Sequence, residues 1–273
     1  MLYYESCALT KRVINNEYNK VKMVREAAAL ILVRDSSNGL QVCMLRRVAT
    51  SSFAAGAFVF PGGAVDEADH ELAISSCCFY QQQTDFKILA CKVAALRETL
   101  EEAGILAANA NKAGVVNNTL RHQLHEGELS FETLLIERAA SLDLDSVMFY
   151  DHWITPEGAP KRFDTRFFIA KGSMGHQVSH DNIETDSSCW ALPEEILSLY
   201  EQGEVKLMPV THVQLKRLST FKKVSDVLAF AKKQNNVPII EPLLNVDEAG
   251  KPVSVTIHLS EGIVEYLLYK AKA

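Results

Sequence analysis

The chain has 273 residues, enough for one large domain or two small ones. Hydrophobic residues make up 48% and charged residues 23% of the chain, as is ordinary for a globular protein. The formal net charge of −6 argues against a general nucleic-acid-binding surface and against binding to an anionic membrane. The longest strongly apolar run, residues 27–33, is far too short to span a membrane. We therefore expect neither nucleic acid nor membrane as a partner.

The six cysteines contain no Cys-x-x-Cys pair, which argues against a structural zinc site. We interpret them as reduced, mostly buried thiols of an intracellular, cytoplasmic protein. Residues 1–12 contain no apolar signal core. The last three residues, Ala271-Lys272-Ala273, have the small-basic outline of a peroxisomal tripeptide but end in Ala, and we attribute that likeness to chance.

Three short strands are predicted near the start of the chain, after an arm formed by residues 1–24. A turn cluster, Asp35 to Gly39, separates the first two strands and predicts a hairpin. Residues 48–57 are small and polar, as in a loop that lies against a ligand. The strands are expected at residues 25–34, 40–47 and 57–60.

A helix that ends before Gly104 is predicted to carry three carboxylates on one face and apolar residues on the other. Carboxylates so close together repel one another, and they lie at the negative end of the helix dipole. A divalent cation would remove both problems. The alternative is that they are ordinary solvated glutamates, which are good helix formers. The acidic face consists of Glu98, Glu101 and Glu102, and the apolar face of Val93, Leu96, Leu100 and Ala103.

Together, Pro61-Gly62-Gly63 and the acidic helix resemble the Nudix box. That pattern is Gly, five residues, Glu, seven residues, Arg-Glu, an apolar residue, any residue, Glu-Glu, any residue, Gly and an apolar residue. Gly63 begins it, Asp69 takes the place of the first Glu, and residues 97–105 complete it. Thr99 replaces an apolar residue, and 27 residues rather than seven separate Asp69 from the Arg-Glu pair. The box is thus split by an insertion over about residues 70–90, expected to be a helical excursion on the surface.

The resemblance implies an α+β fold, an α/β/α sandwich with a mixed sheet between helices. We expect one Nudix domain over residues 1–273, with a core at about 22–205 and a C-terminal extension at about 206–273. The extension is predicted to contain two helices within residues 210–234 and strands at residues 237–240, 253–259 and 264–269. Dimers are common in the family, so a homodimer is a further expectation by analogy.

Nudix hydrolases use Mg²⁺ or Mn²⁺ to cleave a nucleoside diphosphate linked to another group. By resemblance, Glu98 and Glu102 hold one metal and Glu101 helps to hold a second. The backbone carbonyl of Gly62 or Gly63 offers a further ligand, because glycine leaves it unobstructed. Arg97 is expected to orient the glutamates and to contact Asp69.

The catalytic base and a further metal ligand remain open. Glu98 is one candidate base. The other is Glu184, six residues before Trp190, which is also the candidate for the additional metal contact. Asp181 and Asp186 are its rivals, and each of these acidic residues has simple solvation as its alternative.

Two further segments resemble a Nudix subgroup that includes the mammalian peroxisomal coenzyme A diphosphatase with an interrupted box. They are Trp153-Ile154-Thr155-Pro156 and residues 162–168, Arg-Phe-Asp-Thr-Arg-Phe-Phe. The resemblance implies hydrolysis of coenzyme A and acyl-CoA to 3′,5′-adenosine bisphosphate and (acyl-)4′-phosphopantetheine, with Arg162 and Arg166 as substrate contacts. By this analogy alone, a peroxisomal location is an alternative. The second segment also fits a half-buried strand with a surface ion pair between Asp164 and Arg166.

The upstream signature of coenzyme A-cleaving Nudix proteins is matched in part. Arg47, Gly56 and residues 60–63 fall in register, and Arg46 or Arg47 is the candidate for binding the 3′-phosphate. Both arginines could instead face solvent at a strand end. Val48 and Ser52 replace expected residues, which keeps ADP-ribose, dinucleotides and nucleotide sugars open as substrates. A non-catalytic Nudix-like sensor is a third hypothesis, and the three intact box glutamates count against it.

Overall fold

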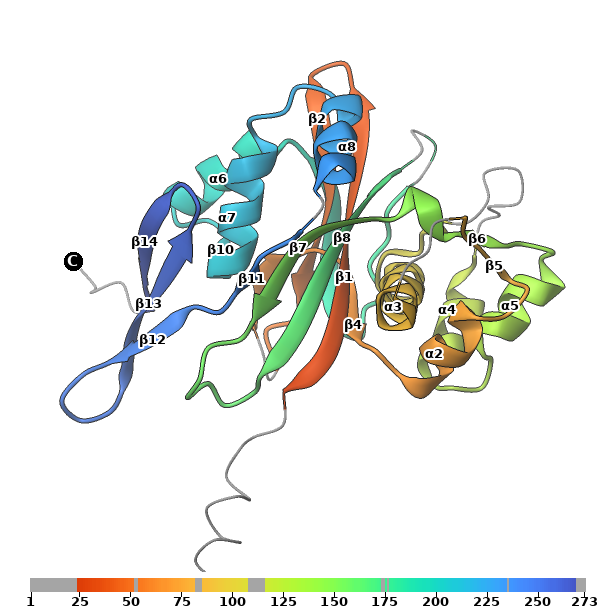
Figure 1. Ribbon diagram of the computed structural model, residues 1–273, viewed down its shortest axis with the longest axis horizontal. Coiled ribbons are helices and arrows are strands. Elements are labelled where there is room, and N and C mark those ends of the chain that lie inside the picture. Colours follow the sequence, from red (N-terminus) through yellow and green to blue (C-terminus); the bar gives the residue numbers. More distant parts are fainter. Residues whose placement is uncertain are drawn as a thin grey trace, which may run out of the picture.

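The computed structural model of the protein describes residues 24–268 apart from 52–53, 82–84, 108–115, 173–174, 176 and 235. The predicted N-terminal arm and the C-terminal tripeptide lie outside these residues. A mixed nine-stranded sheet runs through the middle of the molecule (Figure 1). Its strands are β1 (Arg25–Ser36), β2 (Gly39–Arg47), β3 (Ala57–Val59), β4 (Gly62–Ala64), β7 (Met148–Ile154), β8 (Phe163–Lys171), β9 (Thr185–Ala191), β10 (Lys206–Leu207) and β11 (Ile239–Ile240).

Strand β1 is the centre of this sheet. It pairs parallel with β8 on one side, and antiparallel with β2 and β4 on the other. The main order is β10-β3-β2-β1-β8-β7-β11, with β9 added to β2. The predicted hairpin is confirmed by the pairing of Ser36 with Gly39.

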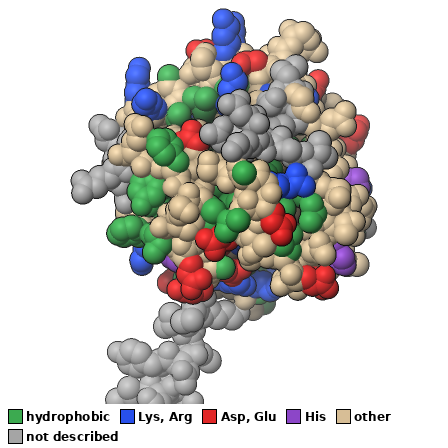
Figure 2. Space-filling view, turned by 90° about the vertical axis from the view of Figure 1, so that its right-hand side faces the viewer, with side chains coloured by type: hydrophobic (Ala, Val, Ile, Leu, Met, Phe, Trp, Pro, Cys, Tyr) green, Lys and Arg blue, Asp and Glu red, His purple; other side chains and the backbone are tan. Residues whose placement is uncertain are grey.

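Helices cover both faces of the sheet (Figure 1). One face carries α3 (Phe86–Ala103), with α2 (Glu67–Ala73), α4 (Asn118–His125) and α5 (Phe131–Glu137) beyond it. Figure 2 looks onto this side, where hydrophobic side chains are interspersed with acidic ones. The other face carries α6 (Pro193–Glu201), α7 (Pro209–Leu218) and α8 (Val224–Lys233). The expected α/β/α arrangement is confirmed.

Alternation along β1 explains why two layers of helices are needed. Leu30 and Leu32 lie in the core under α3, whereas Ile31 and Val33 lie in the core under α6–α8. Successive strand residues point to opposite faces, so a strand with hydrophobic residues at every position needs cover on both. The predicted apolar face of α3 (Val93, Leu96, Leu100 and Ala103) is fully buried in the first core.

The box insertion differs from the expected helical excursion. It begins within α2 but continues into a short strand, β5 (Cys78–Phe79), which pairs parallel with β6 (Leu142–Asp143). Two-residue strands carry no periodicity of their own, and this pairing depends on a partner more than 60 residues away, so it could not be read from the local sequence. A single 3₁₀ turn, Leu144–Ser146, follows β6.

The chain after residue 205 is built into the rest of the molecule. Strand β10 joins one edge of the central sheet through β3, and β11 joins the other edge through β7. The predicted helices of this part are α7 and α8. A separate three-stranded sheet contains β12 (Leu243–Val246), which the sequence did not predict, β13 (Pro252–Leu259) and β14 (Gly262–Leu267).

Among the residues described, five cysteines are free thiols, in agreement with the expected reduced state: Cys43, Cys77, Cys78, Cys91 and Cys189. Burial raises the pKa of Cys78 to about 12 and that of Cys91 to about 11. No helix in the described part of the chain combines the length and apolar character needed to cross a bilayer.

Candidate active site

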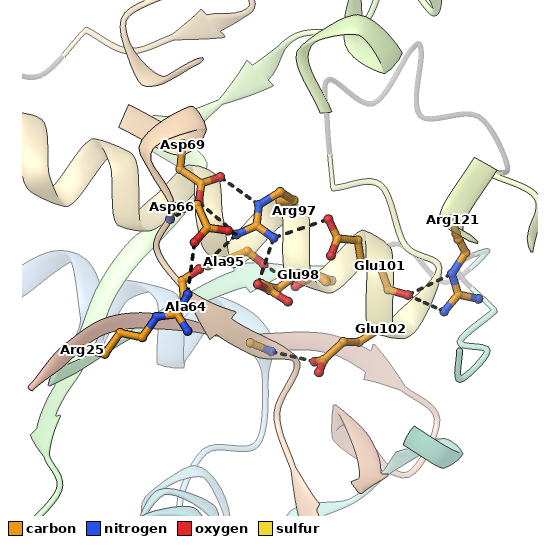
Figure 3. Close-up of polar contacts among 12 residues, drawn as sticks. Arg25, Ala64, Asp66, Asp69, Ala95, Arg97, Glu98, Glu101, Glu102 and Arg121 are labelled. Atoms are coloured by element: carbon orange, nitrogen blue, oxygen red, sulfur yellow. Dashed lines mark hydrogen bonds and ion pairs between the residues drawn. The ribbon is translucent and has the colours of Figure 1, made fainter. Parts of the chain in front are cut away.

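The interrupted box closes in space through an arginine–aspartate pair (Figure 3). Arg97 on α3 donates from Nε to Asp69 Oδ1 and from Nη2 to Asp69 Oδ2, each at 2.9 Å. Asp69 is only 1% exposed, and its Oδ2 also accepts the backbone N–H of Asp66 at the start of α2. This two-point pairing fixes both position and angle. The expected contact across the insertion is confirmed.

Arg97 also holds the acidic face of α3. Its Nη1 donates to Glu98 Oε1 at 2.9 Å and to Glu101 Oε1 at 3.4 Å, and its Nη2 donates to the Ala64 carbonyl at 3.0 Å. The guanidinium therefore connects α2, α3 and β4. Arg97 thus contacts two of the box glutamates, and its role in orienting them stays a prediction.

Two residues of the box, Thr99 and Gly104, are explained by their local surroundings. Thr99 is fully buried, and its hydroxyl donates to the Ala95 carbonyl one turn earlier, at 2.7 Å, so a polar residue is accommodated where an apolar one is usual. Gly104 ends α3 in the left-handed conformation at φ 70°. A Cβ there would approach the Nη1 atom of Arg121 to 3.1 Å.

Gly62 and Gly63 are required by the close approach of two elements. A Cβ on Gly62 would lie 2.5 Å from the Ala28 carbonyl oxygen of β1, and a Cβ on Gly63 would lie 2.5 Å from the carboxyl carbon of Glu98. Glu102 Oε2 accepts the Gly62 N–H at 2.9 Å. The strand between Pro61 and Ala64 thus lies directly against the acidic face of α3.

The pairing of β4 with β1 shows that the two candidate metal-ligand carbonyls, of Gly62 and Gly63, point in opposite directions. Pro61 and Val65 are both hydrogen-bonded to β1, and Gly63, opposite Ala28, lies two residues from each of them. Along an antiparallel ladder, every second residue directs its N–H and carbonyl toward the partner strand, so the Gly63 carbonyl faces β1. The N–H and carbonyl of Gly62 face the opposite way, the direction in which Gly62 meets Glu102.

The box glutamates are not ordinary solvated residues, so that alternative is wrong. The side chains of Glu98 and Glu101 are 15% and 11% exposed, and Glu102 is 3% exposed. Burial raises the pKa of Glu98 to about 7 despite the opposing charge of Arg97. Burial and the nearby Glu98 raise the pKa of Glu102 well above its usual range. Asp69, Glu98 and Glu101 share Arg97, whereas Glu102 accepts the Gly62 N–H.

The oxygen donors of this set fit a divalent cation, although the carboxylates do not converge on one point. In the described part of the chain, no group of three or more His, Cys, Asp or Glu side chains is placed to hold a metal ion. The reason is that Glu98 and Glu101 turn toward Arg97, and Glu102 turns toward the Gly62 N–H. All available donors are oxygens, buried and short of positive charge, which is the environment that hard cations prefer.

Of the three acidic candidates, Asp181 and Glu184 lie in the loop before β9 and Asp186 lies within β9, and Glu184 is the one nearest to the box. Its charge adds to the rise in the pKa of both Glu98 and Glu102. Asp181 instead organises the loop by accepting the N–H groups of residues 183, 184 and 185, and these bonds outweigh burial and lower its pKa. Asp186 forms an exposed ion pair with Arg46 at 2.7 Å.

The four arginines proposed as substrate contacts fall into two groups. Arg47 pairs with Glu184 at 3.1 Å, and its charge opposes the rise in the pKa of Glu102, so it lies beside the box. Arg46 lies at the same end of β2. Arg162 pairs with Glu241 and donates to the Thr155 carbonyl. Arg166 pairs with Glu26 and Asp164.

The Asp164–Arg166 pair is not the surface pair that was expected, because the two side chains are 22% and 12% exposed. Neither Arg162 nor Arg166 contacts a box carboxylate among the residues described. Their role in substrate binding stays a prediction.

Sequence reasoning missed Arg121 on α4. It is 4% exposed and donates from Nη2 and Nε to the Glu101 carbonyl, at 2.8 and 3.2 Å (Figure 3). A cation at the carboxyl end of a helix satisfies unpaired carbonyls and complements the dipole. No local signal identifies Arg121, because its partner is a backbone atom of a different helix.

Comparison with known proteins agrees with this geometry. The NUDT19 Nudix domain family matches residues 80–218, just over half of the chain. The chain belongs to the Nudix hydrolase family. A crystal structure of a NUDIX hydrolase from Alicyclobacillus acidocaldarius is 29% identical, with a TM-score of 0.70, and the match covers 77% of this chain and 97% of that one.

Two curated relatives extend the comparison. A Caenorhabditis elegans protein named as a nudix hydrolase is 29% identical over 72% of this chain and 61% of its own length. The acyl-coenzyme A diphosphatase NUDT19 of Xenopus laevis is 24% identical over 78% of this chain and 73% of its own. The chain therefore spans between three-fifths and three-quarters of the length of these two relatives.

Proposed function

We propose that this protein uses Mg²⁺ or Mn²⁺ to hydrolyse the diphosphate linkage of coenzyme A and acyl-CoA esters. The products are 3′,5′-adenosine bisphosphate and (acyl-)4′-phosphopantetheine. The observation that carries the proposal is the reassembled box, in which Asp69, Glu98 and Glu101 share Arg97 and Glu102 meets the backbone of Gly62. The names of the NUDT19 relatives support the choice of substrate.

Glu98 and Glu102, one turn apart, would hold a cation together with the Gly62 carbonyl, and Glu101 would help to hold a second. When bound, the cation neutralises the diphosphate and lowers the pKa of the attacking water. Arg97 keeps the glutamates aligned through its bonds to Asp69 and Ala64. Of the two ligand carbonyls considered, the ladder register favours Gly62 over Gly63.

The reaction adds water across a phosphoric anhydride. The water oxygen attacks one phosphorus, the bridging P–O bond breaks, and the other phosphate leaves with the bridging oxygen. A carboxylate must accept the water proton. Glu184, with a side chain 44% exposed and an ion pair to Arg47, has more room to reach a water than Glu98, which is 15% exposed. Both remain candidates for the base.

One observation favours a second candidate function. The arginines assigned to the 3′-phosphate already have carboxylate partners, because Arg47 pairs with Glu184 and Arg46 with Asp186. A substrate without a 3′-phosphate, such as ADP-ribose, a dinucleotide or a nucleotide sugar, would leave these pairs intact. Coenzyme A must displace them.

Purified protein incubated with coenzyme A, an acyl-CoA, ADP-ribose, NADH and capped RNA, each with Mg²⁺ or Mn²⁺, separates the two functions. We expect 3′,5′-adenosine bisphosphate from coenzyme A and acyl-CoA, at the highest kcat/KM of the series. Good cleavage of ADP-ribose or NADH without cleavage of coenzyme A would establish the second function instead. No cleavage of any substrate with either metal would contradict both.

A further inference from the structure

A cleft opens beside Glu101, on the side of the box away from β4. Its volume is about 290 Å³, which is near the lower limit for ligand pockets. One wall is α4, and the other is the loop before β9. The lining residues are Glu101, Asn118, Arg121, His122, His125, Asp181, Asn182 and Ile183. We call this the α4 cleft.

The α4 cleft is continuous with the proposed diphosphate site through two shared elements. Glu101 belongs to both the box and the cleft. His125 of α4 lines the cleft together with Glu101. The Asp181 loop presents Ile183 to the cleft and the next residue, Glu184, to the box.

The walls of the cleft are fixed in place. Arg121 ties α4 to the end of α3 through the Glu101 carbonyl and to Ser179 Oγ at 2.9 Å. The Asp181 carboxylate holds the opposite loop through backbone N–H groups, and Asn182 adopts φ 63°, a conformation that Asn tolerates better than most residues. A cleft held on both sides in this way is formed before a ligand arrives.

The charges of the cleft argue against a phosphate as its occupant. Glu101 and Asp181 contribute two carboxylates, and the described lining contains no lysine. The guanidinium of Arg121 is already occupied by the Glu101 carbonyl and Ser179. By contrast, Arg46 and Arg47 do not line the cleft, and they pair with Asp186 and Glu184. An anionic end of the substrate is attracted to the arginines and repelled by the cleft.

The remaining side chains suit an uncharged chain that contains amides. Asn118 and the two histidines of α4 each offer hydrogen-bond donors and acceptors, which match the N–H and C=O of an amide. Ile183, 43% exposed, offers an apolar contact for the methyl and methylene groups between them. The volume of the cleft suits one end of a two-ended substrate better than the whole of it.

We propose that the α4 cleft is the subsite for the pantetheine arm of the substrate, and that the 3′-phosphorylated nucleotide lies on the Arg47 side. This inference rests on the proposed coenzyme A hydrolysis and deepens it. The two reaction products then occupy separate halves of the site. Each should inhibit the enzyme through its own half.

Product inhibition of coenzyme A hydrolysis tests this arrangement. In Ile183→Trp the larger ring fills the cleft, so the inhibition constant of 4′-phosphopantetheine should rise about tenfold or more, because a blocked preformed pocket loses its contacts. The inhibition constant of 3′,5′-adenosine bisphosphate should stay within about twofold. In Arg47→Ala, the inhibition constant of 3′,5′-adenosine bisphosphate should rise and that of 4′-phosphopantetheine should stay nearly constant. Ile136→Trp, the same change at an exposed residue of α5, is the matched control and should alter neither constant.

His122→Leu provides a second variant, because His122 is an exposed lining residue whose replacement leaves the loop before β9 untouched. It should weaken inhibition by 4′-phosphopantetheine selectively. Unchanged inhibition by this product in both cleft variants, or a larger change for 3′,5′-adenosine bisphosphate, would overturn the subsite while leaving the proposed function intact. Failure of the wild-type protein to cleave coenzyme A would overturn the proposed function and the subsite together.

Discussion

Two buried polar clusters in this molecule have opposite balances of acids and donors. Between β7 and α7, the single carboxylate of Asp151 is 2% exposed and accepts hydrogen bonds from Trp153 Nε1 at 2.8 Å, Arg217 Nη1 at 3.2 Å and Gln214 Nε2 at 3.4 Å. In the Nudix box, the carboxylates of Asp69, Glu98 and Glu101 share Arg97, and Glu102 accepts the Gly62 N–H. The Asp151 cluster has more hydrogen-bond donors than carboxylates, whereas the Nudix box has more carboxylates than cationic donors.

The difference separates a structural site from one prepared for a ligand. Burial raises the pKa of Asp151 as well, but the charge of Arg217 and the hydrogen bonds from Trp153 and Gln214 oppose that rise and hold the carboxylate in a single arrangement. Buried carboxylates without enough positive charge raise one another's pKa and lower the stability of the fold unless a cation joins them. Substitutions in the two clusters should therefore have opposite consequences for activity and stability.

The largest effect is expected from Glu98→Gln and Glu102→Gln. Each removes a negative charge that would hold the cation, so kcat/KM should fall about a hundredfold or more. Unfolding temperature in the absence of metal should not fall, because a buried like-charge repulsion is relieved. Steady-state kinetics and thermal unfolding check this. Full activity in both variants would show that the metal assignment is wrong.

The reverse outcome is expected for Asp151→Asn. Arg217 loses its buried partner, so the free energy of unfolding should fall by about 2–4 kcal/mol. Turnover per folded molecule should be unchanged. Urea denaturation, combined with kinetics below the unfolding transition, measures both quantities. Loss of activity without loss of stability would place Asp151 in the catalytic machinery and remove the contrast between the clusters.

The two glycines of β4 should differ in a predictable way. In Gly62→Ala, the new methyl group meets the Ala28 carbonyl of β1, so the free energy of unfolding should fall by about 2 kcal/mol or more. In Gly63→Ala, the methyl group meets the movable end of Glu98, so the fold should survive while kcat/KM falls. Equal stability of the two variants would contradict the placement of β4 against β1 and α3.

A smaller effect is expected in the pH dependence of stability without metal. The pKa of Glu98 is raised from 4.5 to about 7, so between these values the folded protein binds more protons than the unfolded chain. Stability should therefore fall as the pH rises from about 4.5 to 7, and should level off above that range. Saturating Mg²⁺ should abolish the fall, because it favours the ionised carboxylate. Urea unfolding across this range, with and without Mg²⁺, measures the difference. A metal-free protein that becomes more stable over this interval would contradict the burial of Glu98.

The helical half of the box could be predicted because its signals are local. The spacing of Glu98, Glu101 and Glu102 against the apolar face follows from helix periodicity, and Gly104 follows from the αL conformation at a helix end. Even the long-range contact between Asp69 and Arg97 was accessible, because both residues stand in register with a known pattern.

The parts that could not be predicted depend on partners distant in the sequence. Strand β4 has two glycines among its three residues, and its strand conformation comes from pairing with β1. Strand β5 exists through β6, and Arg121 acts through a backbone carbonyl of α3. The partial burial of the Asp164–Arg166 pair likewise follows from the packing of α3 across β1 and β8, because Cys91 of α3 contacts Arg166.

Calorimetric titration of the metal-free protein with Mn²⁺ tests the central claim most directly, since it measures cation binding independently of any substrate. The wild-type protein and Asp151→Asn should bind Mn²⁺ with the same affinity, and Glu102→Gln should bind it at least about tenfold more weakly, because one charged ligand is lost. Absence of Mn²⁺ binding by the wild-type protein, or equal binding by Glu102→Gln, would contradict the assignment of the acidic face of α3 as a metal site.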